Sequence, residues 1–232
     1  MTRRRILAWS VHAYTALGLL LAAGAVILIV QGGEGDLRRA LLLLLLAGVV
    51  DCTDGWLARR VGVAEVLPHV DGRRLDDIID FHAYVSIPLL LLWRAGIPEG
   101  TWAWLLLAPL LASGYGFAQV EAKTPDGFFR GFPSYWNIVA FYLFFLAPPP
   151  WLSGVILAGF AVLVFVPSPY LHPSKGGPWP ALTMTLGAVW TLLVLGILVG
   201  VARPEGVWVW VSLAFPIYYL AVSWFGIRRR SG

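Results

Sequence analysis

Long apolar runs alternate with short polar segments along the whole chain. About 20 consecutive apolar residues allow a helix to cross the hydrocarbon core of a bilayer. The polar segments, several of them rich in Gly and Pro, mark where such helices end. The pattern predicts an all-α, polytopic integral membrane protein with about eight transmembrane helices, the first ending near Val30 and the others covering about residues 40–60, 73–93, 101–120, 135–146, 151–166, 181–201 and 207–226.

The composition excludes a soluble fold. Hydrophobic residues make up 59% of the 232 residues and charged residues only 13%, which is about half the share in soluble proteins. The 12 Trp residues fit aromatic belts at two membrane interfaces. We assign the net charge of +4 to basic loops that meet anionic headgroups, so it predicts membrane lipids and no nucleic acid as partners.

The Lys and Arg residues are shared unevenly between the two sides that eight helices would define. Thirteen of the 17 fall on the side of both termini, and four fall on the other side. Because cytoplasmic loops carry the excess of basic residues, both termini are expected in the cytoplasm. No repeat or linker divides the sequence, which predicts a single membrane-embedded catalytic domain over residues 1–232.

Seven of the thirteen carboxylates lie between residues 51 and 80, where two apolar runs meet a polar segment. Asp51 and Asp54 are three residues apart, and Asp76 and Asp80 are four apart, so each pair shares a helix face. Four carboxylates at one point would repel one another, and Mg²⁺ or Mn²⁺, which prefer oxygen ligands, would relieve this repulsion. Asp77 lies about 100° around the helix from Asp76, which favours a solvated or capping role.

Small residues and an arginine accompany the first pair of acids. Gly55 and Ala58 leave the helix surface bare beside Asp54, so that a bulky group could lie against the backbone. Arg59, near the same helix end, suits a phosphate contact. Acids, a bare surface and an arginine together predict metal-assisted chemistry on a phosphate ester.

These residues resemble the signature of the CDP-alcohol phosphotransferases. The matching pattern is Asp51-x-x-Asp54-Gly55-x-x-Ala58-Arg59, followed by Gly72-x-x-x-Asp76-x-x-x-Asp80. Twelve residues separate the two halves, more than in most members, and this spacing resembles the bacterial phosphatidylcholine synthase branch. Two helices beyond the six that are usual in the family resemble the same branch.

The resemblance implies an activity and a role for each signature residue. A phosphatidyl group would pass from CDP-diacylglycerol to choline, with release of CMP. Two Mn²⁺ or Mg²⁺ ions would be held by the four signature aspartates, with Asp80 also acting as general base. Gly55, Ala58, Arg59 and Gly72 would bind the nucleotide and its phosphates. A homodimer in the bacterial inner membrane, with its active site at the cytoplasmic face, is expected.

An aromatic segment predicts where choline binds. Residues 132–137, within the loop 121–137, resemble a stretch of the same branch, and quaternary ammonium groups bind against aromatic faces. Tyr135 and Trp136 are the candidate rings, although both could be interface anchors. The further candidates are Asn137, Glu121 at the end of the fourth predicted helix, and Tyr84, which shares a face with Asp80.

Two alternatives to choline transfer stay open. The same reaction could use serine, inositol, ethanolamine or glycerol phosphate as acceptor, although the aromatic loop and the long signature argue against these. A phosphorylated acceptor would also call for a stronger basic cluster. The acids could instead line the ion path of a carrier, but ion conduction does not explain the glycines and arginine of the signature.

Overall fold

The computed structural model describes residues 2–120, 124, 127–172, 179–203 and 205–228. The chain forms two compact units, unit 1 (Met1–Ala95) and unit 2 (Gly96–Gly232). Both are built from helices, and the only strands among the described residues are two of three residues each. The prediction of an all-α membrane protein is confirmed.

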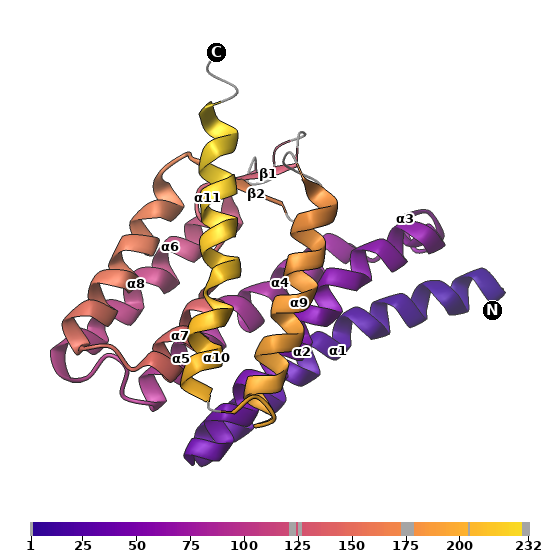
Figure 1. The fold of residues 1–232 in the computed structure, drawn as a ribbon. Helices are drawn as coiled ribbons and strands as arrows, with labels where there is room; N and C mark the ends of the chain where they lie inside the picture. Colours follow the sequence, from indigo (N-terminus) through magenta and orange to yellow (C-terminus); the bar gives the residue numbers. More distant parts are fainter. Residues whose placement is uncertain (1, 121–123, 125–126, 173–178, 204, 229–232) are drawn as a thin grey trace. The chain divides into compact units, whose positions relative to one another are not determined.

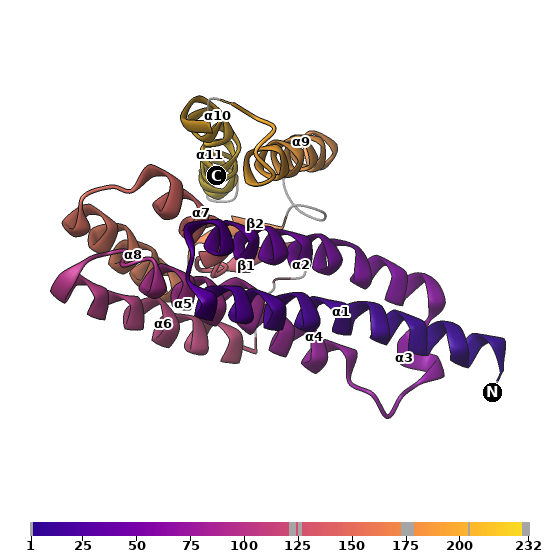
Figure 2. The same ribbon diagram turned by 90° about the horizontal axis from the view of Figure 1, so that it is seen from below.

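Unit 1 contains a long helical hairpin and a third, composite helical stretch (Figure 1). Its elements are α1 (Arg3–Gln31), α2 (Glu34–Val61), the short α3 (Val63–Val66), α4 (Gly72–Asp80), the π-helical segment η1 (Phe81–Ser86) and α5 (Ile87–Arg94). Figures 1 and 2 both show α1 and α2 side by side. Small residues on α1, among them Ala22 and Ala25, are fully buried, and such residues let membrane helices approach closely.

Glycines end both α1 and α2. The C-caps of the two helices, Gly32 and Gly62, have φ angles of 76° and 70° in the left-handed region, which glycine adopts without strain. Acidic residues occupy the first turn of α2, and Arg59 and Arg60 occupy the last, so both ends complement the helix dipole. The helix therefore stops directly after the first half of the signature, as the sequence predicts.

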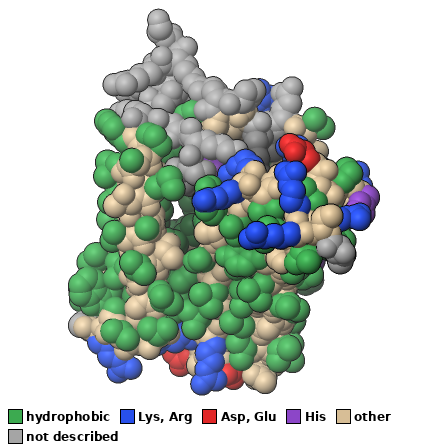
Figure 3. All heavy atoms as spheres, turned by 90° about the vertical axis from the view of Figure 1, so that its right-hand side faces the viewer, with side chains coloured by type: hydrophobic (Ala, Val, Ile, Leu, Met, Phe, Trp, Pro, Cys, Tyr) green, Lys and Arg blue, Asp and Glu red, His purple; other side chains and the backbone are tan. Residues whose placement is uncertain are grey.

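Charged side chains gather at the end of unit 1 that carries α3 and the start of α1. Figure 3 shows basic groups concentrated over this end. The exposed residues that contribute to it are Arg3, Arg4, Arg5, Arg59, Arg60, Arg73 and Arg74. Large apolar side chains on the hairpin, such as Leu20 and Ile27, are also exposed, which fits contact with lipid.

Unit 2 packs helices around a short strand pair. Its elements are η2 (Gly100–Leu106, 3₁₀), α6 (Leu107–Ala118), β1 (Phe128–Arg130), α7 (Trp136–Leu146), α8 (Pro150–Phe165), β2 (Pro169–Leu171), α9 (Pro180–Leu198), α10 (Glu205–Ser212) and α11 (Ala214–Arg228). The strands are antiparallel, with Phe128 opposite Leu171. Side chains of α11 bond to β2, because Tyr219 donates to the Leu171 carbonyl (2.8 Å) and Ser223 accepts from its N–H (3.0 Å).

Every predicted helical segment coincides with a helix or a run of helices. Among the described residues, five stretches are long and apolar enough to cross a membrane, namely Arg3–Gln31, Glu34–Val61, Gly100–Ala118, Pro180–Leu198 and Gly206–Trp224. The 11 residues of α7 span only about 16 Å, which is shorter than a hydrocarbon core. Eight transmembrane helices therefore stay a prediction.

Candidate active site

The two halves of the signature lie on two helices of unit 1. Asp51 and Asp54 are on the last turns of α2, and Asp76 and Asp80 are on α4. Carboxylate oxygens of Asp51, Asp76 and Asp80 lie within 4.8 Å of one another, and all three residues are half-buried. The structure thus brings three of the four predicted ligands together from residues up to 29 positions apart.

Asp54 lines the same small pocket but lies outside this three-carboxylate cluster. Its side chain is 6% exposed, the most buried of the four aspartates. The Thr15 hydroxyl of α1 hydrogen-bonds to its carboxylate, and Arg59 attracts it electrostatically. Buried carboxylates are retained when hydrogen bonds and charges compensate them, so Asp54 is held firmly at the edge of the cluster.

The pocket between α1, α2 and α4 is narrow. Its volume is about 10 Å³, close to that of one water molecule. All four signature aspartates line it, together with Thr15, Gly18, Ala47, Val50, Ile79, Ala83 and Tyr84. A Cβ atom on Gly18 would lie 3.1 Å from the Ile79 side chain, so this glycine lets α4 approach α1. The donor set suits a divalent cation, since oxygen-only sets favour Mg²⁺ or Mn²⁺.

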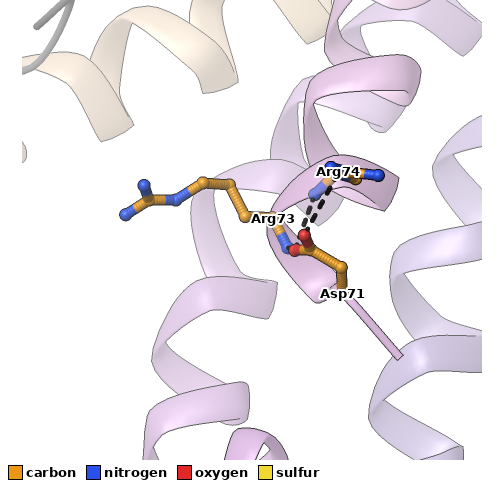
Figure 4. A network of polar contacts seen from close by, with 3 residues as sticks. All are labelled: Asp71, Arg73 and Arg74. Atoms are coloured by element: carbon orange, nitrogen blue, oxygen red, sulfur yellow. Dashed lines mark hydrogen bonds and ion pairs between the residues drawn. The ribbon is translucent and has the colours of Figure 1, made fainter. Parts of the chain in front are cut away.

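Helix α4 begins at a cap that the sequence analysis did not identify. The Asp71 carboxylate accepts from the backbone N–H groups of Arg73 (3.1 Å) and Arg74 (3.2 Å), and it also pairs with the Arg74 side chain (Figure 4). Such a cap fixes where the helix starts. Within the helix that begins there, the four-residue interval places Asp76 and Asp80 on one face. Asp77, which was predicted to be solvated or capping, is half-exposed within α4.

The other signature residues surround the ends of α2 and α4. A Cβ atom on Gly55 would lie 3.3 Å from the guanidinium of Arg59, so Arg59 folds back over the glycine. Ala58 packs partly buried against a small apolar core around Val63 and Leu67. A Cβ atom on Gly72 would lie 3.3 Å from the ring of His12 on α1. Each glycine therefore makes room for a polar side chain.

Tyr84 lies in η1, directly after α4, and lines the pocket as its predicted face requires. Its hydroxyl donates a 2.8 Å hydrogen bond to Oδ2 of Asp51. From the sequence, this ring is predicted only as a candidate contact for choline. No spacing rule connects two residues 33 positions apart, so the contact could not have been found from the sequence.

The remaining choline candidates belong to unit 2. Tyr135 is half-buried and makes edge contacts with the rings of Phe129 and Tyr219. Trp136 is fully buried, and its N–H donates to Ser113 at 2.7 Å. The side-chain oxygen of Asn137 accepts from the N–H of Ile138. Glu121 lies outside the described residues. Contact between any of them and choline stays a prediction.

Comparison with known proteins identifies the family. The sequence model described as CDP-alcohol phosphatidyltransferase matches residues 11–167, which include the whole carboxylate pocket. The chain belongs to the CDP-alcohol phosphatidyltransferase family. It is therefore a transferase, and the three-carboxylate cluster fits a family that is metal-dependent in general.

Several relatives in this family share nearly the full length. The chain is 34% identical to a phosphatidylcholine synthase of Legionella pneumophila, over 94% of this chain and 88% of that protein. It is 35% identical to one of Pseudomonas aeruginosa over 94% of each. A third, from Bradyrhizobium diazoefficiens, is 38% identical over 82% of this chain and 71% of that protein. Matches of 94% must include most of the residues beyond 167, where the family model ends.

Proposed function

We propose that this protein is a phosphatidylcholine synthase, which transfers the phosphatidyl group of CDP-diacylglycerol to choline and releases phosphatidylcholine and CMP. The observation that carries the proposal is the similarity, over 94% of the chain, to two proteins of that name. The clustered carboxylates of unit 1 support it, because transfer from a pyrophosphate requires its negative charge to be neutralised.

The signature aspartates would hold Mn²⁺ or Mg²⁺. Asp51, Asp76 and Asp80 supply the first set of oxygens, and Asp54 would contribute to a second ion. Three carboxylates within 4.8 Å repel one another strongly in a half-buried site, which supports a bound cation. The chemistry supplied by bound ions is neutralisation of charge on the pyrophosphate and on the departing CMP.

Protein groups would complete the reaction around that charge. Asp80 would accept the proton of the choline hydroxyl as general base. Arg59 would pair with a donor phosphate, and Gly55, Ala58 and Gly72 would bind the cytidine phosphate. The buried Nε2 of His12, beside Gly72, has no hydrogen-bond partner among the described residues, and a bound nucleotide would supply one.

Choline would be recognised by aromatic and polar side chains outside the signature. Tyr135, with part of its surface accessible, is the favoured ring for cation–π contact, and Asn137 would orient it. Trp136 is fully buried, which favours a role in packing and not in direct contact with choline. Tyr84 and Glu121 are the further candidates. Each favourable ring contact contributes about 0.5–2 kcal/mol.

The setting of the reaction is also proposed. Both termini and the active site would lie on the cytoplasmic side of the bacterial inner membrane, and the protein would be a homodimer. The excess of basic residues at one end of unit 1 supports this orientation, because such residues mark cytoplasmic ends (Figure 3).

A panel of acceptor alcohols tests the proposal. Purified protein, CDP-diacylglycerol and Mn²⁺ are offered choline, serine, inositol, ethanolamine and glycerol 3-phosphate separately, and CMP and lipid products are measured. Choline should give phosphatidylcholine and the fastest CMP release. A different preferred alcohol would refute choline while leaving the transfer reaction intact. No CMP with any alcohol would refute the transfer itself.

A further inference from the structure

A hydrogen bond links the segment just after the signature to the first half of the signature. The hydroxyl of Tyr84, on η1, donates to Oδ2 of Asp51, on α2, at 2.8 Å. Asp51 is one of the three clustered carboxylates, and Tyr84 lines their pocket. The bond therefore acts directly on a predicted metal ligand. A carboxylate has about four lone-pair positions, so it can accept this hydrogen bond and also bind a metal ion.

The chain makes space for this hydroxyl. Gly48 lies three residues before Asp51 on α2, and a Cβ atom there would stand 3.3 Å from the Tyr84 oxygen. Contacts of that length require the neighbour to move by a few tenths of an ångström. Any larger residue at this position would press on the hydroxyl. The absence of a side chain at Gly48 thus leaves room for the Tyr84 hydroxyl, just as its absence at Gly18 leaves room for Ile79.

The π-helical segment η1 is the second local feature that places the Tyr84 hydroxyl. It covers Phe81–Ser86 and begins directly after Asp80. A π-turn changes the phase of the residues that follow, and such turns occur frequently at functional sites. Tyr84 stands in the middle of this segment, so the local helix geometry decides where its hydroxyl lies.

We propose that Tyr84 is a positioning residue for Asp51, holding its carboxylate in the orientation that binds the metal ion. The inference rests on the proposed function and deepens it, because it assigns the tyrosine hydroxyl to the metal and not to choline. Partners that bond to metal ligands fix ligand orientation, and losing one typically lowers metal affinity or activity by about 10–100-fold.

The Tyr84→Phe variant separates the two roles, because it keeps the ring and removes the hydroxyl. Mn²⁺ binding is measured by electron paramagnetic resonance on purified protein without substrates. We expect the Kd for Mn²⁺ to rise about tenfold or more. Turnover should fall most at limiting Mn²⁺ and recover with excess, while the KM for choline at saturating Mn²⁺ stays within about twofold.

Two further variants make the test decisive. Gly48→Ala should weaken Mn²⁺ binding in the same direction, since it displaces the hydroxyl without removing it. Tyr142→Phe is the matched control, because it also removes a hydrogen-bonded tyrosine hydroxyl, one that bonds to Ser212 and Trp190 in unit 2. This variant should leave the Mn²⁺ affinity unchanged. Should Tyr84→Phe fail to fold, Gly48→Ala alone decides the question.

Two results would overturn the inference. Unchanged Mn²⁺ affinity in folded Tyr84→Phe and Gly48→Ala would refute the positioning role. A raised choline KM with unchanged Mn²⁺ affinity would return the tyrosine to the acceptor site. If wild-type protein bound no Mn²⁺ and needed none for turnover, the metal-dependent mechanism itself would fail, and that outcome is distinct from a failure of Tyr84 alone.

Discussion

The carboxylate pocket of unit 1 and the aromatic segment of unit 2 arrange their polar groups differently. In the pocket, three half-buried carboxylates converge, and their repulsion calls for a cation. In the aromatic segment, the Trp136 N–H and the Asn137 oxygen already have partners within the protein, and the rings pack against one another. Converging charges of one sign thus point to chemistry, whereas neutral polar groups bonded among packed rings point to architecture.

Of the changes considered, metal removal should reduce the activity of the carboxylate pocket most. Because the clustered carboxylates need cations between them, EDTA should abolish CMP release, and added Mn²⁺ or Mg²⁺ should restore it. A thermal unfolding curve recorded with and without EDTA checks that unit 2 persists. Full turnover in metal-free buffer would remove the basis for the pocket's role.

Replacement of Asp80 by Asn should come next. The change keeps the size of the side chain and removes its charge and basicity, so turnover should fall by well over tenfold, which corresponds to more than about 1.4 kcal/mol in activation free energy. Steady-state kinetics on folded protein in detergent measure the loss. The Asp77→Asn variant is the control, since this neighbour lies outside the cluster. A residual rate above about a tenth would require another base.

The fully buried tryptophan gives a test of stability. Trp136→Ala empties a fully buried site and leaves Ser113 without its donor, so it should lower the free energy of unfolding by about 3–5 kcal/mol. Chemical denaturation in detergent measures the change. Trp151→Ala, at a site that is 55% exposed, is the control. Wild-type stability combined with a raised choline KM would show that Trp136 contacts the substrate.

The half-buried neighbour of that tryptophan should affect the acceptor. Tyr135→Ala removes the favoured cation–π contact and should raise the choline KM several-fold, with little change in the KM for CDP-diacylglycerol. Tyr135→Phe, which keeps a ring, should retain most of the affinity. If both Michaelis constants rise together, the residue shapes the fold and does not bind choline.

The smallest effect is expected at the start of α4. Asp71→Ala removes the cap from two backbone N–H groups and should lower the free energy of unfolding by about 1 kcal/mol. Asp71→Asn should retain most of the stability, because Asn also caps helices. Denaturant midpoints measure both. Equal loss in the two variants would indicate that charge, and not capping, is what matters here.

The sequence predicted features that depend on local spacing. Apolar runs gave the positions of the helical segments. The intervals from Asp51 to Asp54 and from Asp76 to Asp80 predicted that each pair shares a helix face. All four aspartates were expected to meet, and three of them form the cluster. Contacts between distant segments were not accessible in this way. The bond from Tyr84 to Asp51 depends on a π-helical turn, and the burial of Trp136 depends on Ser113, which lies 23 residues earlier. Neither follows from periodicity, because each is decided by how helices pack.

The hydrogen bonds between α11 and β2 determine where this chain can be truncated without loss of stability. The family model ends at residue 167, which would suggest a catalytic module with dispensable C-terminal helices. Tyr219 and Ser223, however, satisfy the carbonyl and N–H of buried Leu171. A chain shortened before α11 would lose both hydrogen bonds, each worth about 0.5–1.5 kcal/mol, together with the helix that packs on β2. The end of the family model at residue 167 is therefore not a folding boundary, because the last helix is bonded to β2.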